Sequence, residues 1–454
     1  MFYYTLQLEA ASKTVIFCYI LKALFERKKR GLMVVHGRQL VDQGADRLER
    51  EAVPHGIVMA GRKPILNAPI YVCSVDTLRA RKLRPPADLI VIDEAHMACS
   101  ESYKALIADY PDAYILAVTA TPYVTKSMRH LADAVVSPIG IQGLIDQGYL
   151  VRPRYIVPVQ HDLSELRVDK KTGDYAIADI AAFFSKSAII GDICSTWNTF
   201  AKGRPTICFA PTIAVSQAIV LQMQEQGIRA AHVEANTPDK ERKARMADLC
   251  EGRLDVLSNV GILCVGVDLP PVSCILMARP TKSLNLYIQQ AGRGTRIHDT
   301  KRDFLILDHA NNVREHGFIT DEHEVHLDGM PKTTRVAGVK VCPECYAASP
   351  NGAAVCSECG YEFTDADRTP DHEDGELAEI EESAEEIQVK SFIKETKRTQ
   401  KAKGYKRGWI YFQICGKFGL EVTEKYMKIP DWARGRIQQW EALPSTRNSS
   451  TPSS

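Results

Sequence analysis

The sequence has no long apolar run and almost no net charge. No apolar stretch reaches the roughly 18 residues of a membrane span, and the N-terminus lacks the layout of a secretory signal peptide. We therefore expect a cytoplasmic protein without a membrane partner. Because the formal net charge is only +1 at pH 7, the overall charge gives no sign of a nucleic-acid partner.

The length and the remaining composition are those of an ordinary soluble protein. A chain of 454 residues suffices for roughly two to four domains. Of thirteen cysteines, four form one tight group, and the others are scattered singly, several of them in apparent strands. We expect the scattered cysteines, such as Cys73, Cys208 and Cys274, to be reduced residues of the core.

Residues 88–97, DLIVIDEAHM, carry the strongest local signal. The run from Leu89 to Ile92 predicts a buried parallel strand that ends on Asp93 and Glu94. In open α/β sheets, ligands bind at that end of the strands. An aspartate there can hold Mg²⁺ beside a nucleoside triphosphate, and the adjacent glutamate can orient or deprotonate the attacking water. A solvated acidic turn is the alternative.

The first residues predict a strand, a tight turn and a helix that opens on Lys13 and Thr14. This is the layout of a phosphate-binding loop, in which Lys13 would neutralise phosphate and Thr14 would ligate Mg²⁺. The pattern G-x-x-x-x-G-K-[ST] requires glycine where this chain has Gln7 and Ser12. Glycine lets the backbone approach phosphate and adopt angles that a Cβ resists. The loop is therefore degraded or reshaped, with Ser12 as a candidate nucleotide contact.

Polar residues also follow three further strand candidates. GLMVVHGRQL has Arg38 at a strand–helix junction, APIYVCSVDTL leads to Ser74 and Thr77, and AYILAVTATPY ends on Thr119 and Thr121. Small hydroxyl groups at such positions can bond phosphates or an acidic site. A helix cap is the alternative for each of them.

The strand–helix alternation resumes after a boundary suggested by Gly148 and Pro153, and predicts a second α/β domain. Its GVDLP segment contains Gly266 and Asp268. Its YIQQAGRGTR segment places Arg293 and Arg296 three apart, on one face of the first turns of a helix. Guanidinium forks suit bidentate contact with a γ-phosphate, as arginine fingers from a neighbouring lobe. A pair of solvated arginines is the alternative.

From about Leu6 to Gly317 these motifs resemble those of superfamily 2 helicases of the DEAD/DEAH type, in the expected order. KT is similar to motif I, HGRQL to motif Ia, DEAH to motif II, TAT to motif III, GVD to motif V and QQAGRGTR to motif VI. The second half, with LILDHANNVREHG, resembles the RadD-type repair helicases and related phage helicases. The chain begins about where the first strand of the family begins. A mis-assigned start, a truncated copy and true divergence are the open explanations.

The resemblance implies two RecA-like lobes, residues 1–148 and 149–332, with ATP and Mg²⁺ between them. Nucleic acid would lie across both lobes, with Arg38, Ser74, Thr77, Thr119 and Thr121 as candidate contacts. Motif position also implies which residues would bind the nucleotide and Mg²⁺. Gln289 is among them, as the leading glutamine of motif VI. The full set is Ser12, Lys13, Thr14, Asp93, Glu94, Gly266, Asp268, Gln289, Arg293 and Arg296.

Two C-x-x-C knuckles, 342–345 and 356–359, predict a structural zinc site in a ribbon spanning residues 333–364. Four thiolates can complete a tetrahedral Zn²⁺ site and leave no open position for catalysis. The predicted ligands are Cys342, Cys345, Cys356 and Cys359. Redox use of the four thiols is the alternative.

Two charge blocks follow the ribbon. Residues 365–386 hold eleven acidic residues and one basic residue, whereas residues 390–407 hold eight basic residues and one acidic residue. They predict an acidic, disordered linker (365–388), a basic, aromatic module (389–444) and a frayed tail (445–454). The aromatic residues near Trp409 would either stack on nucleic-acid bases or form the core of a small helical module.

The expected fold is thus α/β, with two tandem RecA-like lobes and parallel sheets, a zinc ribbon and a small basic module. The expected function is that of an ATP-dependent helicase or translocase, on DNA in preference to RNA, in repair, recombination or phage replication. A single-strand-binding or replication protein is the expected protein partner. The alternatives are a catalytically impaired nucleic-acid-binding protein and the motor subunit of a nuclease or restriction assembly.

Overall fold

The computed structural model describes two compact units, residues 1–368 and 369–454, each described by itself below. In the first unit the described residues are 3–7, 13–63, 65, 67–123, 127–136, 139–158, 163–264, 267–323, 325, 327–328 and 338–364. In the second unit they are 389, 392–393, 396, 399–400, 408–418, 420–426, 429–430, 433–435 and 437–438.

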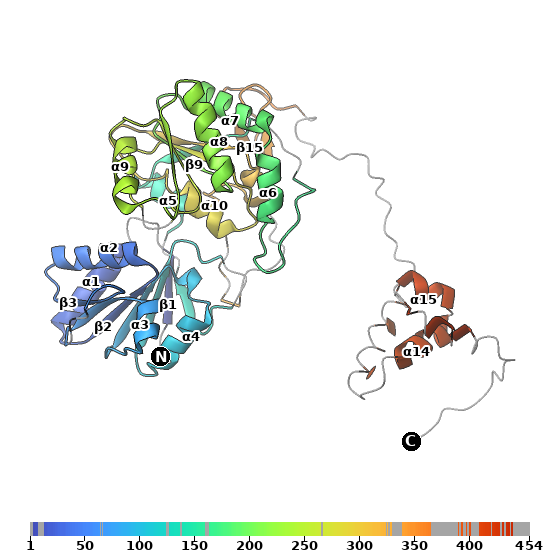
Figure 1. The fold of residues 1–454 in the computed structure, drawn as a ribbon, viewed down its shortest axis with the longest axis horizontal. Helices are drawn as coiled ribbons and strands as arrows, with labels where there is room; N and C mark the ends of the chain where they lie inside the picture. The colour runs from blue at the N-terminus through green and yellow to red at the C-terminus, as the bar shows by residue number, and fades with distance from the viewer. Residues whose placement is uncertain are drawn as a thin grey trace, which may run out of the picture. The chain divides into compact units, whose positions relative to one another are not determined.

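The first lobe is built on a seven-stranded parallel sheet in the order β3-β4-β2-β5-β6-β1-β7 (Figure 1). The strands are β1 (Tyr3–Gln7), β2 (Gly31–Val35), β3 (His55–Val58), β4 (Ile70–Ser74), β5 (Leu89–Asp93), β6 (Tyr114–Thr119) and β7 (Ala134–Val136). The helices are α1 (Lys13–Glu26), α2 (Arg38–Arg50), α3 (Val75–Arg81), η1 (Ala95–Met97) and α4 (Glu101–Ala108), whereas α5 (Ile141–Asp146) lies with the second lobe, on whose core Ile141 packs (Figure 1).

Both faces of this sheet are covered, which explains why its central strands read as continuous apolar runs. Met33 and Val35 pack on the side of α1 and α2, and Leu32 and Val34 pack on the side of α3 and α4. The DEAH strand, β5, lies between β2 and β6 in the middle of the sheet, as its apolar run predicted. Its carboxyl end is therefore fixed by neighbours on both sides.

The second lobe repeats this plan with a six-stranded parallel sheet in the order β10-β11-β9-β12-β13-β8. The strands are β8 (Arg152–Ile156), β9 (Thr206–Phe209), β10 (Ala230–Val233), β11 (Val256–Asn259), β12 (Cys274–Met277) and β13 (Asp303–Asp308). The helices are α6 (Ile177–Phe184), α7 (Ser187–Phe200), α8 (Ile213–Glu225), α9 (Asp239–Cys250), α10 (Leu284–Ala291) and α11 (Asn312–His316). The expectation of two parallel-sheet lobes is confirmed.

The four-cysteine ribbon is built onto the edge of the second lobe. It contains the antiparallel pair β14 (Val339–Val341) and β15 (Ala348–Pro350). Ile156 of the edge strand β8 forms a bridge with Ala347, and the Val157 N–H donates to the Tyr346 carbonyl at 2.8 Å. Cys342 belongs to the same apolar cluster as one face of the lobe's sheet. The ribbon therefore shares the core of the lobe.

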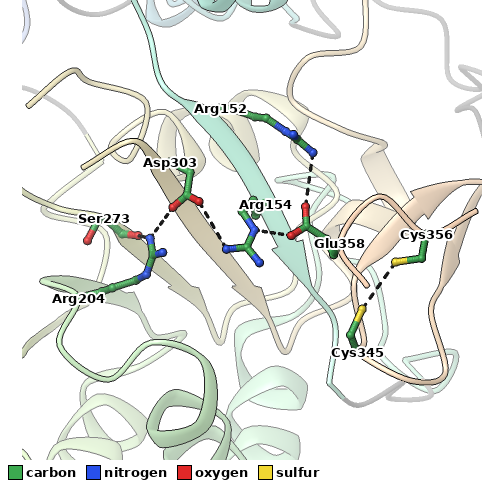
Figure 2. A network of polar contacts seen from close by, with 8 residues as sticks. All are labelled: Arg152, Arg154, Arg204, Ser273, Asp303, Cys345, Cys356 and Glu358. Carbon is green, nitrogen blue, oxygen red and sulfur yellow. Dashed lines mark hydrogen bonds and ion pairs between the residues drawn. The ribbon is translucent and has the colours of Figure 1, made fainter. Parts of the chain in front are cut away.

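An ion-pair network fastens the second knuckle to the sheet (Figure 2). The Glu358 carboxylate accepts from Arg154 at 2.5 Å and from Arg152 at 3.4 Å, both on β8. Arg154 also pairs with Asp303 on β13 at 3.4 Å, and Arg204 pairs with the same carboxylate at 2.7 Å. One residue between two cysteine ligands is thus linked to two strands of the second lobe.

In the second unit, α14 (Gly408–Phe418) and α15 (Leu420–Tyr426) organise two small apolar clusters. Trp409 and Phe418 pack with one cluster, and Tyr411 and Phe412 pack with the other. Among the described residues, the aromatic side chains therefore contribute to a helical core, which was one of the two open alternatives. Throughout the described part of the chain, no helix has the length and apolarity needed to cross a membrane.

Candidate functional site

Three neighbouring strands of the first lobe bring the predicted nucleotide motifs to one edge of the sheet. Gln7, the last residue of β1, is in register with Thr119 of β6, and Val118 is in register with Asp93 of β5. Helix α1 begins at Lys13, after the loop that follows β1. The carboxyl ends of parallel strands thus unite motifs I, II and III. The loop with Ser12, and the side chains of Lys13 and Thr14, lie outside the described residues.

The acidic pair occupies a sharp, buried turn at the end of β5. Asp93 is 6% exposed and Glu94 is 9% exposed. Glu94 has a left-handed backbone with φ of 52°, and its N–H donates to the Asp93 carboxylate at 2.9 Å. Residues other than glycine rarely adopt this conformation, and those that do concentrate at functional sites. The turn places two carboxylates together inside the site, where solvent screens them little.

His96 connects this turn with motif III. Its Nδ1 atom lies 3.0 Å from the Thr119 hydroxyl and 3.5 Å from Glu94 Oε2. The Thr119 hydroxyl also accepts from the Thr121 N–H at 3.1 Å. Thr119 and Thr121 are fully buried, and their hydroxyls contact His96 and Gln289 respectively in this structure. His96 belongs to the DEAH sequence, but no pattern in the sequence indicated a role for it.

The second lobe reaches this cluster through α10. The Gln289 amide nitrogen lies 3.1 Å from His96 Nε2 and donates to the Thr121 hydroxyl at 3.1 Å. One turn earlier, the Asn285 side chain accepts from the Tyr123 N–H at 3.0 Å. This pattern fits a His96 ring protonated on Nδ1, which donates to motif III while Nε2 accepts from Gln289. Asn285 and Tyr123 had no distinguishing motif and were missed.

The two motif VI arginines lie beyond the end of α10, not on the first turns of a helix as expected. The helix ends at Ala291 because Gly292 and Gly294 follow, and glycine is a poor helix former. Gly294 also lies so close to the Phe304 ring that a Cβ would be 2.1 Å from a ring carbon. The expected helical face is therefore replaced by a turn.

Both guanidinium groups hold the motif V loop of their own lobe. Arg293, 8% exposed, donates to the Val267 carbonyl at 2.5 Å and to the Cys264 carbonyl from two nitrogens. Arg296 donates to Val267 at 2.8 Å and to Asp268 at 2.6 Å. Burial, then the charge of Arg296, lowers the pKa of Arg293 to about 10. Gly266 lies outside the described residues.

Two of the three remaining predicted nucleic-acid contacts, Arg38 and Thr77, bond the loop after β3. Arg38 is exposed, and its guanidinium lies 3.4 Å from the Ala60 carbonyl as a donor. The Thr77 hydroxyl accepts from the Ala60 N–H at 3.1 Å. Ser74 and Thr77 are each 7% exposed. Of these three candidates, Arg38 is the one that is exposed to solvent, whereas Ser74 and Thr77 are buried.

The four cysteines converge as the knuckle spacing predicted. Their sulfur atoms lie within 4.8 Å of one another, with Cys342–Cys359 and Cys345–Cys356 separations of 3.6 Å. Tetrahedral Zn²⁺ with bonds of about 2.3 Å spaces sulfur ligands about 3.8 Å apart. Although burial raises it, backbone N–H groups of Cys359 and Glu358 lower the pKa of Cys356 to about 7. The donor set and its geometry are compatible with a structural zinc ribbon.

Two family models match the chain, one on each lobe. Residues 11–124 match the family described as type III restriction enzyme, res subunit. Residues 185–298 match the helicase conserved C-terminal domain. The first model covers DEAH, and the second covers QQAGRGTR, so the two halves of the site fall in two matched domains.

Several known proteins are similar to this chain. A 51.5 kDa protein of a Lactococcus phage is 29% identical over 94% of this chain and 93% of its own length. The putative ATP-dependent helicase IRC3 of Saccharomyces cerevisiae is 28% identical over 65% of this chain and 46% of its own length, so the chain spans about half of that relative.

A fragment of a putative HsdR subunit of a type I restriction enzyme from Vibrio vulnificus has the same fold. Its TM-score is 0.54 at 18% identity, over 73% of this chain and 64% of that one. With two parallel-sheet lobes, matched helicase-type domains and the motifs at the facing edges, the chain belongs to the superfamily 2 helicases.

Proposed function

We propose that this protein is an ATP-dependent translocase or helicase that acts on DNA. The observation that carries the proposal is the series of polar contacts from Glu94, whose Oε2 lies 3.5 Å from His96 Nδ1, through the His96 ring to Gln289, whose amide nitrogen lies 3.1 Å from His96 Nε2. It links Glu94, which would activate water in this proposal, with the helix that precedes the motif VI arginines. A path of this kind couples hydrolysis in one lobe to the position of the other.

The first lobe would supply the nucleotide and Mg²⁺ ligands. A buried carboxylate at the end of β5 and the start of α1 fit a metal-bound triphosphate, because the helix N-terminus favours anions. In this scheme Lys13 and Thr14 hold the phosphates and Mg²⁺, Asp93 holds Mg²⁺, and Glu94 orients water. Bound Mg²⁺·ATP would supply the phosphoryl group and neutralise its developing charge.

The second lobe would supply positive charge to that phosphoryl group. The Arg293 bonds to Cys264 and Val267 use three of its five N–H groups, which leaves two as donors for a phosphoryl oxygen. Arg296 lies beside it, held by Asp268. Because Glu94 is among the charges that act on Arg293, the acidic turn and the arginines already interact across the lobes.

DNA is the nucleic acid that the restriction-type family match favours. Arg38, exposed at the start of α2, is the proposed phosphate contact of the first lobe, and Thr77 bonds the loop that Arg38 contacts. Thr119 and Thr121 are reassigned in the proposal to coupling between lobes, because they bond His96 and Gln289. The basic residues of the second unit would add sequence-independent phosphate contacts.

The test is DNA-stimulated ATP hydrolysis by the wild type and by Glu94→Gln and Lys13→Ala. We expect measurable turnover at high ATP concentration that both substitutions abolish. Glu101→Gln is a matched control, since Glu101 is 88% exposed on α4 and away from the acidic turn. A wild-type rate equal to that of Glu94→Gln at saturating ATP and DNA would refute the proposal.

A non-hydrolysing DNA-binding protein is the second candidate. It is favoured by Gln7 and Ser12, which replace the glycines of the phosphate-binding loop. Ser12→Gly should tighten nucleotide binding if the loop otherwise keeps its shape. DNA binding without any Glu94-dependent turnover, in the wild type and in Ser12→Gly, would establish this second function.

A further inference from the structure

A third cation, Lys301, lies behind the two motif VI arginines. It is 8% exposed, and its ammonium donates to the Val272 carbonyl at 2.6 Å and to the Gly294 carbonyl at 2.9 Å. Among the described residues no carboxylate pairs with it. Burying an ammonium group without a carboxylate partner costs free energy. Its presence here therefore indicates that its hydrogen bonds to the two carbonyls have a role. Burial, and then the charge of Arg296, lowers the pKa of Lys301 to about 7.

The two carbonyls belong to the two segments that fix the arginines. Gly294 lies between Arg293 and Arg296 in the chain, and its backbone is pressed against the Phe304 ring. Val272 follows the motif V loop, whose earlier residues accept from both arginines. The arginines thus bind the motif V loop at Val267, and Lys301 bonds both Val272, which follows that loop, and Gly294, which lies between the arginines.

We infer that Lys301 is a positioning residue for ATP hydrolysis, which holds Arg293 and Arg296 in place by tying Gly294 to Val272. This inference rests on the proposed function. Within the described residues, the hydrogen bonds of the Lys301 ammonium go to these two backbone carbonyls, so Lys301 would act through the arginines and not on the nucleotide.

Loss of the two Lys301 hydrogen bonds is expected to lower kcat. An arginine finger stabilises charge that develops in the transition state, and interactions made only there change kcat more than KM. A displacement of about 1 Å in a catalytic group can cost about 10²-fold in rate. Lys301→Met keeps the length of the side chain and removes both bonds. We therefore expect kcat to fall by about tenfold to a hundredfold.

The experiment compares Lys301→Met, Lys301→Arg and Lys202→Met with the wild type. Lys202 is an exposed lysine of the same lobe and serves as the control. We measure kcat and KM for ATP at saturating DNA, the affinity for DNA, and thermal melting. Lys301→Met should lower kcat at least about tenfold, with KM within about threefold and DNA affinity unchanged. Lys301→Arg, which restores a cationic donor, should recover most of the loss, and Lys202→Met should equal the wild type.

Several results would overturn the inference. A Lys301→Met kcat within about twofold of wild type shows that the tie does not position the arginines. If Lys301→Met does not fold, Lys301→Gln is measured instead, since its amide keeps one neutral donor. Failure of both to fold makes the lysine purely structural. A wild type without Glu94-dependent turnover removes the proposed function and the inference together, whereas normal turnover with an unaffected Lys301→Met removes the inference alone.

Discussion

Glu358→Gln removes the ion pair that joins the second C-x-x-C knuckle to the second lobe. The carboxylate is 16% exposed, and its closest partner, Arg154, is 32% exposed. Fully exposed pairs contribute about 0.2–1 kcal/mol, and breaking a fully buried pair costs about 3–5 kcal/mol. The pair with Arg154 lies between these limits, and Arg154 keeps Asp303 as a second partner. We expect a loss of about 1–2 kcal/mol in the free energy of unfolding.

The repeated knuckle supplies a matched control. Glu344 has the same place between Cys342 and Cys345 that Glu358 has between its own two cysteines. It is exposed and forms no ion pair within the described part of the chain. Glu344→Gln therefore changes the same chemical group at the same distance from the metal ligands, without touching the sheet.

Thermal melting measures the difference. For a body of 150–250 residues, 1 kcal/mol shifts the melting temperature by about 2–4 °C, so Glu358→Gln should melt about 2–8 °C lower. Glu344→Gln should melt within about 1 °C of wild type, and zinc content should be unchanged in both. Combining Glu358→Gln with Arg154→Gln should cost less than the sum of the two single changes. Equal melting temperatures for the two glutamate variants would refute the role of the pair.

Three further predictions follow from the same structure. Metal analysis should find about one zinc ion per chain, and wild-type protein without zinc would refute the site. Cys356→Ser should lose the zinc. It should also destabilise the second lobe as well as the ribbon, because Cys356 belongs to the core of that lobe. The free energy of unfolding should rise by about 2 kcal/mol between pH 7 and pH 9, because the unfolded chain keeps the Lys301 proton up to about 10.5 whereas the folded one loses it near 7. Lys301→Met should lack this rise in the free energy of unfolding. A pH profile of Lys301→Met parallel to that of the wild type would contradict the prediction. Deleting residues 389–454 should leave the melting of the two lobes unchanged and reduce the salt dependence of DNA binding; an unaltered salt slope would exclude phosphate contacts by that unit.

The central strands were predictable from the sequence, whereas the edge strands β3 and β8 were not. The run from Leu89 to Ile92 is buried on both faces of the sheet, so its apolar pattern is continuous. Pro153 suggested a boundary, yet it lies inside β8. Proline lacks the N–H that a central strand needs but is tolerated on an edge strand. Strand β3, with alternating half-buried and buried residues over four positions, gave too short a signal.

The sequence motifs indicated which residues to expect in one site, but not the contacts that these residues make. Motif order placed Asp93, Glu94 and Arg293 on facing lobes. The bonds of Arg293 to backbone carbonyls had no sequence signal, because a carbonyl acceptor is present at every residue. The tie made by Lys301 is of the same kind. Its partners are 29 and 7 residues away in the chain, and no side-chain pattern marks them.

The position of the ribbon beside β8 has a consequence for how the protein behaves without metal. An unpaired edge strand offers a row of N–H and C=O groups that can pair with another chain, and such edges promote aggregation. Here the Ala347 bridge to Ile156 and the Tyr346 carbonyl occupy part of that row. Chelation of the zinc should therefore produce concentration-dependent oligomers joined through β8. A zinc ion at this site would then limit self-association through β8 as well as hold the ribbon together.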